Sequence, residues 1–474
     1  FPDRFRIGKN SSAPEKAEQG LYPQGAIIKK WNELPDDSGN RSIQHFGGDL
    51  WGIAEKADYI ASLGADAVYI TPIHEAPSYH RYDATDYRSV DKALGGMKAF
   101  DAMPEALHAR GIHVIMDLVL NHVSSRHPFF VDALASPSSR YRSWFLFNDD
   151  GSFSSWWGNP RLPELNLEND DVLKEFVTGE ESVLRFWADR GVDCFRLDCA
   201  NDLGVHISRL VTETAKKINP RIRVTGETFH YGVSGLEGPD SIQSYFFTSS
   251  ILAMLHGDIS PRQFGLNVAR AYDEAAPHCG LHASWSMLSS HDFPRPMTTL
   301  NGDIAKLRLA ILLQFTVPGV PMIYYGDEIG MSGGQDPLNR APMIWDETRH
   351  NTHIREWYSK VAGIRKERRE FSRGNFLDLS QWLENGVGGF LRTDPDDPRN
   401  YSIVFANPTR SRKKFTVYVP AAHMFSDLEL VDLLSGARVR SSCGSIHVDL
   451  PAMSGAVYVP DFGCKKGYTF SKRL

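Results

Sequence analysis

Apolar and polar positions follow two alternating periods between residues 49 and 369. Short apolar runs bounded by glycine, proline or charged residues are typical of buried strands, whereas apolar residues three or four apart predict helices with one buried face. The pattern predicts strands at 67–72, 112–120, 192–198, 222–227, 283–290 and 320–325, and helices at 49–63, 97–110, 172–190, 205–218, 304–315 and 352–369. Regular alternation of strand and helix indicates an α/β fold with a parallel sheet.

Polar residues at the strand ends distinguish a closed barrel from an open sheet. Acidic side chains stand at or just after the carboxyl ends of four strands: Asp117, Asp198, Glu227 and Asp292. A (β/α)8 barrel gathers residues from several strand ends into one site, whereas an open sheet binds its ligand at one switch point, commonly through a glycine-rich loop. The chain contains no G-x-G-x-x-G sequence, so we expect a (β/α)8 TIM barrel.

Two stretches depart from this alternation. Residues 121–170 form a long connection rich in aromatic side chains, and a loop of this length inside a compact domain is usually functional. From residue 373 onward, short β-type runs predict an antiparallel β-sandwich. We therefore expect a barrel formed by 1–120 and 171–372, an inserted domain at 121–170, and a C-terminal β-sandwich at 373–474.

The strand near residue 195 carries an arginine and an aspartate on one face. Alternation places Cys194, Arg196 and Asp198 on the same side of this strand. Because a guanidinium favours the ionised form of a neighbouring carboxylate, we expect Arg196 to lower the pKa of Asp198. An ionised, oriented carboxylate can act as a nucleophile. Isolated Arg-x-Asp pairs are most often structural, so this assignment depends on the other candidate residues.

Glu227 ends the strand one βα unit after Asp198, so neighbouring strands can place two carboxyl groups around one bond. A separation of about 5–5.5 Å is typical of retaining glycosidases. In that arrangement Asp198 attacks the sugar carbon, Glu227 is the general acid and Asp292 binds substrate hydroxyls. Taken alone, Asp117 could equally be a strand-end cap and His122 a hydrogen-bonded loop residue.

Composition and charge narrow the classes of function. Of 474 residues, 42% are hydrophobic and 23% are charged, and the net charge is −6; a globular protein with no basic surface is an unlikely nucleic-acid binder. We find no membrane-spanning run and no signal peptide, so we expect no membrane partner. The five sparse cysteines lack metal-ligand spacing, which favours a cytoplasmic protein without a disulfide framework or metal.

Four segments occur in the order DLVLNH (117–122), FRLD (195–198), GE (226–227) and SHD (290–292). This order resembles the motifs of the α-amylase family, glycoside hydrolase family 13, and 319–328 resembles its last-strand motif. The resemblance covers nearly the whole chain and implies a barrel with an inserted domain and a C-terminal β-domain. It implies that Asp198 is the nucleophile, Glu227 the acid/base and Asp292 the transition-state stabiliser. The residues lining the sugar subsite would be Tyr82, Asp117, His122, Arg196 and His291.

Finer features are similar to the neopullulanase, cyclomaltodextrinase and maltogenic amylase group. Asp336 and Arg340 are similar to that group's clamp on the next sugar, and a carboxylate with a guanidinium suits paired hydroxyls. The resemblance implies hydrolysis of α-1,4 or α-1,6 glucosidic bonds through a covalent glycosyl-Asp198 intermediate, with no cofactor required. The substrate would be a cyclodextrin, maltodextrin, pullulan or related cyclic glucan.

The chain departs from this group near its N-terminus. We see no N-terminal β-domain, which implies a monomer or a dimer built differently, and the family's first barrel strand would precede Phe1, which suggests a clipped sequence. Many members bind calcium nearby, but the loop at 6–13 lacks the acidic ligands that calcium requires. We therefore expect no calcium here, with Lys9 supplying charge opposite Asp49 and Asn121 acting as a loop hydrogen bonder.

Two other functions remain open. On the same scaffold the covalent intermediate can react with water or with a sugar, so a transglycosylase or an α-1,6-glucosidase is an alternative. A catalytically silent binding subunit is a second alternative, although such proteins typically lose the catalytic carboxylates that are all present here. The motifs do not determine the preferred oligosaccharide, which we expect to depend on 121–170 and on Thr228, Phe229 and His230.

Overall fold

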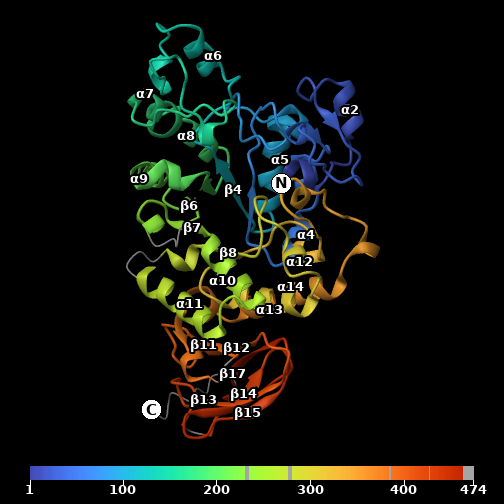
Figure 1. Ribbon diagram of the computed structural model, residues 1–474, viewed down its shortest axis with the longest axis vertical. Helices are drawn as coiled ribbons and strands as arrows, with labels where there is room; N and C mark the ends of the chain where they lie inside the picture. The colour runs from blue at the N-terminus through green and yellow to red at the C-terminus, as the bar shows by residue number, and fades with distance from the viewer. Residues whose placement is uncertain (230–233, 276–279, 384–385, 426, 463–474) are drawn as a thin grey trace. The chain divides into compact units, whose positions relative to one another are not determined.

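The computed structural model describes residues 1–229, 234–275, 280–383, 386–425 and 427–462. The chain forms two compact units, and Figure 1 traces it from blue at the N-terminus to red at the C-terminus. The first unit comprises Phe1–Gln243, His291–Pro294 and Gly333–His350; the second comprises Ser244–Ser290, Arg295–Ser332 and Asn351–Leu474. The expected boundaries of an inserted domain and a C-terminal domain divide the chain differently and stay predictions.

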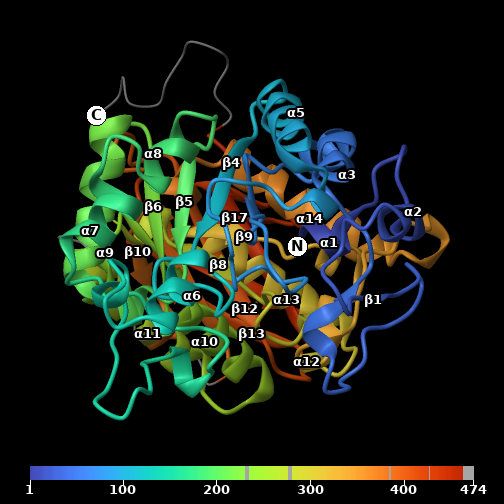
Figure 2. The ribbon, with the colours of Figure 1, turned by 90° about the horizontal axis from the view of Figure 1, so that it is seen from above.

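The parallel strands of the first unit run in chain order, as the pattern predicts. They are β3 (Ala67–Ile70), β4 (His113–Leu118), β5 (Cys194–Leu197), β6 (Arg223–Thr228) and β7 (Ser241–Ser244). Figure 2 shows β4, β5 and β6 side by side. Their register pairs Asp117 with Arg196 and Leu197 with Gly226. The carboxyl ends of these three strands therefore meet at one edge of the sheet.

Helices of the first unit are interrupted where the periodic pattern predicts continuous ones. The expected helix at 49–63 divides into α3 (Leu50–Glu55) and α4 (Ala57–Ser62), because Lys56 leaves the helical conformation. The expected helix at 172–190 divides into α7 (Asp170–Leu173), a π-helical turn and α8 (Val183–Ala188), which Ser182 caps. The remaining elements are α1 (Pro2–Phe5), α2 (Ala13–Glu18), β1 (Ile27–Ile28), β2 (Gln44–His45), α5 (Gly96–His108), α6 (Pro128–Ala135) and α9 (Ala200–Ile218).

Aromatic side chains of residues 121–170 build a small core of their own. Phe130 contacts Phe145 and Phe153 edge to face, at ring-centroid distances of 4.9 and 4.8 Å. Isolated β-bridges connect the backbone of the segment. Trp157, by contrast, is 86% exposed. Part of the aromatic content of this connection is therefore structural.

The second unit begins with helices and a pair of parallel strands. Strands β8 (Trp285–Met287) and β9 (Val320–Met322) pair in parallel, and α13 (Ile304–Thr316) connects them in the chain. The buried amide of Gln314 on α13 donates to the carbonyls of Ser286 and Met322, at 3.1 and 2.8 Å, which ties the helix to both strands. The other helices are α10 (Tyr245–His256), α11 (Pro261–Ala275), α12 (Pro296–Thr299), α14 (Thr352–Glu367) and α15 (Glu370–Arg373).

Two antiparallel sheets share one apolar core at the end of the chain. One has the order β10-β11-β12-β17-β14-β15 and the other pairs β13 with β16. Phe405 and Phe415, one from each sheet, pack edge to face at 5.3 Å inside the buried cluster, which makes this region a β-sandwich. The strands are β10 (Asn375–Asp378), β11 (Gly388–Thr393), β12 (Tyr401–Asn407), β13 (Lys413–Tyr418), β14 (Glu429–Asp432), β15 (Arg438–Arg440), β16 (Ser445–Leu450) and β17 (Ser454–Pro460).

Several elements escaped the periodic pattern. Strand β7 reads Ser-Ile-Gln-Ser, and its single large apolar residue gives no signal for a buried strand, although all four residues are buried. Helix α10 is apolar on most sides, so its amphipathic period is weak. It is nevertheless short, and within the part of the chain that the structure describes no helix has both the length and the apolarity for a bilayer crossing.

Two helical glycines form a matched test of packing. A methyl group on Gly52 in α3 would come within 2.1 Å of the Arg6 carbonyl oxygen, whereas one on Gly363 in α14 would meet nothing within 4 Å. We expect Gly52→Ala to destabilise the protein by about 2 kcal/mol through overpacking. We expect Gly363→Ala to stabilise it by about 0.5 kcal/mol through helix propensity. Thermal unfolding of both variants measures this, and equal melting temperatures would contradict the packing described.

Candidate active site

One buried guanidinium joins three carboxyl groups at the edge of the first unit's sheet. Arg196 Nη1 lies 2.9 Å from Asp117 Oδ1 and 2.6 Å from Asp198 Oδ1, and its Nη2 lies 2.7 Å from Glu227 Oε1. The Arg196 and Asp117 side chains are fully buried. The Arg196 Nε atom also donates to Gln243 Oε1 at 3.2 Å. Asp117 lies on β4, Glu227 lies on β6 and Asp198 directly follows β5, so the parallel register brings together residues that are far apart in sequence.

Asp198 and Glu227 face the same small space. One carboxyl oxygen of each lies within 4.8 Å of the other, with the Cys199 sulfur inside the same limit. The backbone N–H of Cys199 donates to Glu227 Oε2 at 3.0 Å and fixes the orientation of that carboxyl group. Inverting glycosidases separate their two acids by about 6.5–9.5 Å, whereas retaining enzymes hold them about 5–5.5 Å apart. The close approach of Asp198 and Glu227 resembles the shorter of these two separations.

The predicted direction of the Asp198 pKa is wrong. Burial raises the pKa of Asp198 to about 8, and the negative charges of Glu227 and Asp117 act in the same direction. Arg196 lowers it, as predicted, but one guanidinium does not compensate for burial and two neighbouring carboxyl groups together. Burial likewise raises the pKa of Asp117. The free site therefore favours holding a proton among its acids.

Two tyrosines and a histidine complete the surroundings of Asp117. The hydroxyls of Tyr69 and Tyr82 donate to Asp117 Oδ2 at 2.6 and 2.8 Å. His291 Nε2 lies 2.7 Å from the Tyr82 hydroxyl oxygen, and the two rings stack with centroids 5.7 Å apart. Burial holds the pKa of His291 well below its usual range. The imidazole is therefore neutral, which suits hydrogen bonding to a sugar hydroxyl.

His122 stands at the edge of the aromatic segment. Its ring lies 5.6 Å from that of Trp156, and the buried Nε2 atom has no hydrogen-bond partner among the residues that the structure describes. Burial lowers the pKa of His122 to about 4, so the ring is neutral at ordinary pH. A buried polar atom without a partner is costly unless a ligand satisfies it. An open Nε2 suits binding of a ligand, and the predicted contact of His122 with substrate stays a prediction. Asn121 Nδ2 lies 3.4 Å from His122 Nδ1, within hydrogen-bond distance.

Asp292 is held by Arg340. Arg340 Nη2 lies 3.1 Å from Asp292 Oδ1, its Nη1 lies 3.2 Å from Asp336 Oδ1, and its Nε donates to the His291 carbonyl at 2.7 Å. The Asp292 side chain keeps one third of its surface exposed. The structure thus brings Asp336 and Arg340 together, and the same guanidinium also contacts Asp292 and the His291 carbonyl. Their predicted contact with the next sugar stays a prediction.

Sequence reasoning missed several residues that shape the site. Tyr69 and Gln243 contact the ion cluster, and Tyr79 accepts a hydrogen bond from Arg340 at 3.1 Å. The amide of Asn339 donates to the His291 carbonyl at 2.8 Å. None of these residues belongs to a distinctive motif, although Tyr69 faces the opposite side of its strand from the apolar residues next to it. Of the residues expected to tune specificity, His230 lies outside the described residues, and Phe229 is 56% exposed.

A lysine side chain contacts Asp49 at the N-terminal site where many family members bind calcium. Lys16 Nζ lies 2.7 Å from Asp49 Oδ2 and 2.8 Å from the Gly47 carbonyl oxygen. The prediction that Lys9 supplies the charge opposite Asp49 is therefore wrong. The Asp49 oxygens also accept from Ser11 and from backbone N–H groups. Hydrogen-bond donors surround this carboxylate, and a hard cation needs oxygen ligands instead. The residues therefore do not fit calcium.

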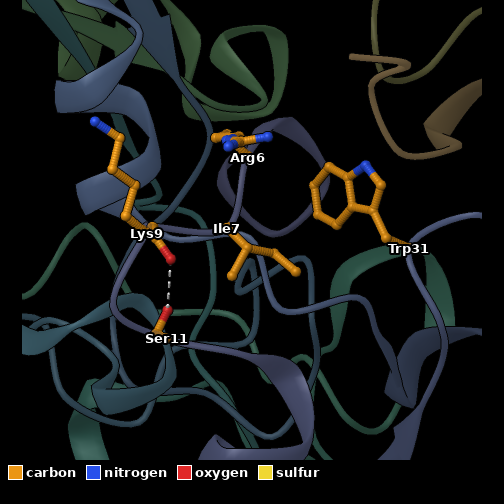
Figure 3. Close-up of a pocket in the computed structure, with 6 residues that line it drawn as sticks. Arg6, Ile7, Lys9, Ser11 and Trp31 are labelled. Atoms are coloured by element: carbon orange, nitrogen blue, oxygen red, sulfur yellow. Dashed lines mark hydrogen bonds between the residues drawn. The ribbon is translucent and has the colours of Figure 1, made fainter. Parts of the chain in front are cut away.

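The loop beside this lysine forms a cavity of about 260 Å³. It is lined by Arg6, Ile7, Gly8, Lys9, Ser11 and Trp31. Figure 3 shows the Lys9 side chain directed away from Ser11 and from Trp31. The Lys9 backbone N–H donates to Glu55 Oε1 at 2.9 Å.

Comparison with known proteins gives a consistent result. The family model described as alpha amylase, catalytic domain, matches residues 1–227 and 262–396. The chain is 33% identical to neopullulanase 2 of Thermoactinomyces vulgaris over 472 residues, which cover 96% of this chain and 76% of that protein. It is 32% identical to a cyclomaltodextrinase of Bacillus sp over 409 residues, covering 84% and 70%.

A solved structure resembles the chain over nearly its whole length. The cyclic α-maltosyl-(1→6)-maltose hydrolase of Arthrobacter globiformis, in its ligand-free form, matches with a TM-score of 0.78 and 28% identity, covering 95% of this chain and 97% of that one. With the parallel strands and the terminal β-sandwich, this likeness confirms the predicted fold class, a (β/α)8 barrel with a C-terminal antiparallel β-domain.

Replacing Lys16 tests the assignment of the N-terminal site. Lys16→Met leaves Asp49 buried without its cationic partner, so we expect a loss of about 3 kcal/mol in unfolding free energy. Lys9→Met is the matched control and should unfold like the wild type. Thermal melts of the wild type in calcium and in chelator should coincide. A calcium-dependent rise in the wild-type melting temperature would show that a metal binds where the ammonium group lies.

Proposed function

The chain belongs to the α-amylase family of glycoside hydrolases, and on that premise we propose that it is a retaining α-glucan hydrolase. In this proposal it cleaves α-1,4 or α-1,6 glucosidic bonds in cyclic or short malto-oligosaccharides. The observation that carries the proposal is the distance between the two acids, because oxygens of Asp198 and Glu227 within 4.8 Å match a double-displacement site and not an inverting one.

The proposed reaction proceeds in two steps. In the first, Asp198 attacks the anomeric carbon while Glu227 gives its proton to the departing glycosidic oxygen, so a glycosyl–Asp198 ester forms as the C–O bond breaks. In the second, Glu227 takes a proton from water, whose oxygen attacks the same carbon and releases Asp198. These steps use protein side chains and water alone, and we propose that no cofactor is required.

Arg196, Asp292 and the tyrosine–histidine pair have supporting roles in this proposal. The ion pair with Arg196 keeps Asp198 oriented, and it supplies positive charge when the ester breaks. Asp292, which is partly exposed and held by Arg340, is placed to bind sugar hydroxyls whose contacts tighten in the transition state. The neutral rings of His122 and His291, with Tyr82, line the same subsite.

The names of the similar proteins suggest the substrate class. Neopullulanase and cyclomaltodextrinase point to pullulan and cyclic maltodextrins. A second candidate is a cyclic tetrasaccharide with α-1,6 bonds, because the Arthrobacter hydrolase named for cyclic α-maltosyl-(1→6)-maltose matches over nearly the full length of both chains. In its complex with that sugar the match has a TM-score of 0.81.

Glu227→Gln tests the assignment of the acid. The amide cannot protonate the leaving oxygen, so we expect kcat on a maltodextrin to fall by about a thousandfold while the protein stays folded. Glu213→Gln, at an exposed position of α9, is the matched control and should keep wild-type rates. The assignment would be overturned if the Glu227 variant retained near-normal turnover.

A substrate panel tests the proposed specificity. Cyclodextrins, pullulan, starch and a cyclic tetrasaccharide with mixed α-1,4 and α-1,6 bonds are compared at equal concentration. We expect kcat/KM for a cyclic or short substrate to exceed that for starch by about tenfold or more, because contacts around the site select among substrates through their transition states. A clear preference for starch would contradict the proposal. With maltotriose, early products longer than the substrate would indicate that transfer exceeds hydrolysis.

A further inference from the structure

Cys199 contacts both acids of the proposed reaction. Its sulfur lies 3.2 Å from Asp198 Oδ2, and its backbone N–H donates to Glu227 Oε2 at 3.0 Å. Among the described residues, Cys194 and Cys443 are also free thiols, but of these three only Cys199 is buried. One residue therefore contacts the two carboxyl groups whose separation defines the mechanism.

We propose that Cys199 is a positioning residue: its thiol donates to Asp198 Oδ2 and orients the nucleophile, while its backbone N–H orients Glu227. The inference rests on the proposed function, since it assigns a role within that same reaction. The thiol acts through Asp198 and forms no bond to the sugar.

The two oxygens of Asp198 are held unequally. Arg196 Nη1 lies 2.6 Å from Oδ1 in a charge-assisted contact, whereas Oδ2 receives the Cys199 thiol. A thiol is a weak donor, so it can fix the rotation of the carboxyl group and still release its oxygen at small cost. A stronger donor at the same position would hold that oxygen more firmly. The pairing thus keeps the nucleophile oriented without binding both oxygens tightly.

The surroundings keep the thiol protonated. Burial raises the pKa of Cys199 well above its usual range, and the neighbouring negative charges of Asp198 and Glu227 act in the same direction. A thiolate beside two carboxylates would repel them both. Cys199 is therefore a hydrogen-bond donor at working pH and a poor nucleophile itself.

The backbone of Cys199 adopts a conformation that few side chains accept. Its φ and ψ are 49° and 41°, in the left-handed region, between the end of β5 and the start of α9. Its carbonyl accepts from the N–H groups of Asp202 and Leu203 at 2.8 and 3.1 Å, and its own N–H points to Glu227. Such conformations persist where surrounding contacts impose them, often at active sites. Here the turn directs the N–H and the thiol to different acids.

The effect of the thiol on pH dependence has a definite sign. A donor to Asp198 stabilises its ionised form, so its removal raises the pKa of the acid cluster and moves the acid limb of kcat/KM to higher pH. The other titratable and charged groups that act on Asp198 come from the neighbouring strands and the preceding loop: Arg196, Asp117, Glu227, Tyr82 and Tyr87. None of them changes when only the thiol is replaced.

Three variants separate donation from packing. Cys199→Val keeps a similar volume without a donor, Cys199→Ser keeps a donor, and Cys194→Val on the preceding strand β5 is the control. We expect Cys199→Val to shift the acid limb upward by about half a pH unit and to lower kcat/KM on its acid side about threefold. Cys199→Ser should keep the acid limb at or below the wild-type position, and the control should match the wild type. Thermal melts verify that each variant is folded.

The outcomes distinguish this inference from the proposed function. If the wild type and the Cys194 control hydrolyse the substrate, but Cys199→Val and Cys199→Ser share the wild-type pH profile, the positioning role is wrong and the reaction assignment stands. If Cys199→Val and Cys199→Ser shift the profile equally, the thiol acts through packing and the inference is also wrong. If the wild type hydrolyses no glucan on the panel, the proposed function itself fails.

Discussion

A single buried positive charge organises this protein's candidate active site. Arg196 bridges Asp117, Asp198 and Glu227, with contacts of 2.6 to 2.9 Å to one oxygen of each. Removing any of these groups from water carries a large desolvation penalty, which close and well-oriented partners must offset. The imbalance of three acids against one guanidinium explains why burial prevails in the pKa of Asp198. A structural ion pair would be neutral overall, whereas this cluster holds three acids to one guanidinium.

The parallel sheet makes that cluster possible. Asp117 and Arg196 are register partners on β4 and β5, and Glu227 stands near the end of β6. Two tyrosine hydroxyls donate to Asp117 Oδ2, which also lies 3.0 Å from Arg196 Nη1. The left-handed turn at Cys199 links the end of β5 to Glu227. Backbone pairing of the strands thus places the acids within hydrogen-bond distance of Arg196. The turns after the strands then orient the carboxyl groups.

The sequence predicted the strand ends well because buried parallel strands are short apolar runs followed by polar residues. It also predicted that Arg196 and Asp198 share a face, since alternation depends on backbone geometry alone. The predicted direction of the Asp198 pKa was wrong because the pKa depends on burial in the folded protein and on the charges of residues distant in sequence, such as Asp117. Lys16 rather than Lys9 pairs with Asp49 for a similar reason: a helix at 13–18 returns the later lysine to the loop. Strand β7 was invisible because three of its four residues lack a large apolar side chain.

The most direct test of the central claim is to trap the glycosyl intermediate. In Glu227→Gln, an α-maltosyl fluoride needs no protonation of its leaving group, so Asp198 can be glycosylated while the second step stalls for lack of a base. Peptide mass analysis should then find one maltosyl group on the peptide that contains Asp198, and no such adduct when Asp198 is replaced by asparagine. Rapid turnover without an adduct, or a maltosyl group attached to another residue, would contradict the account.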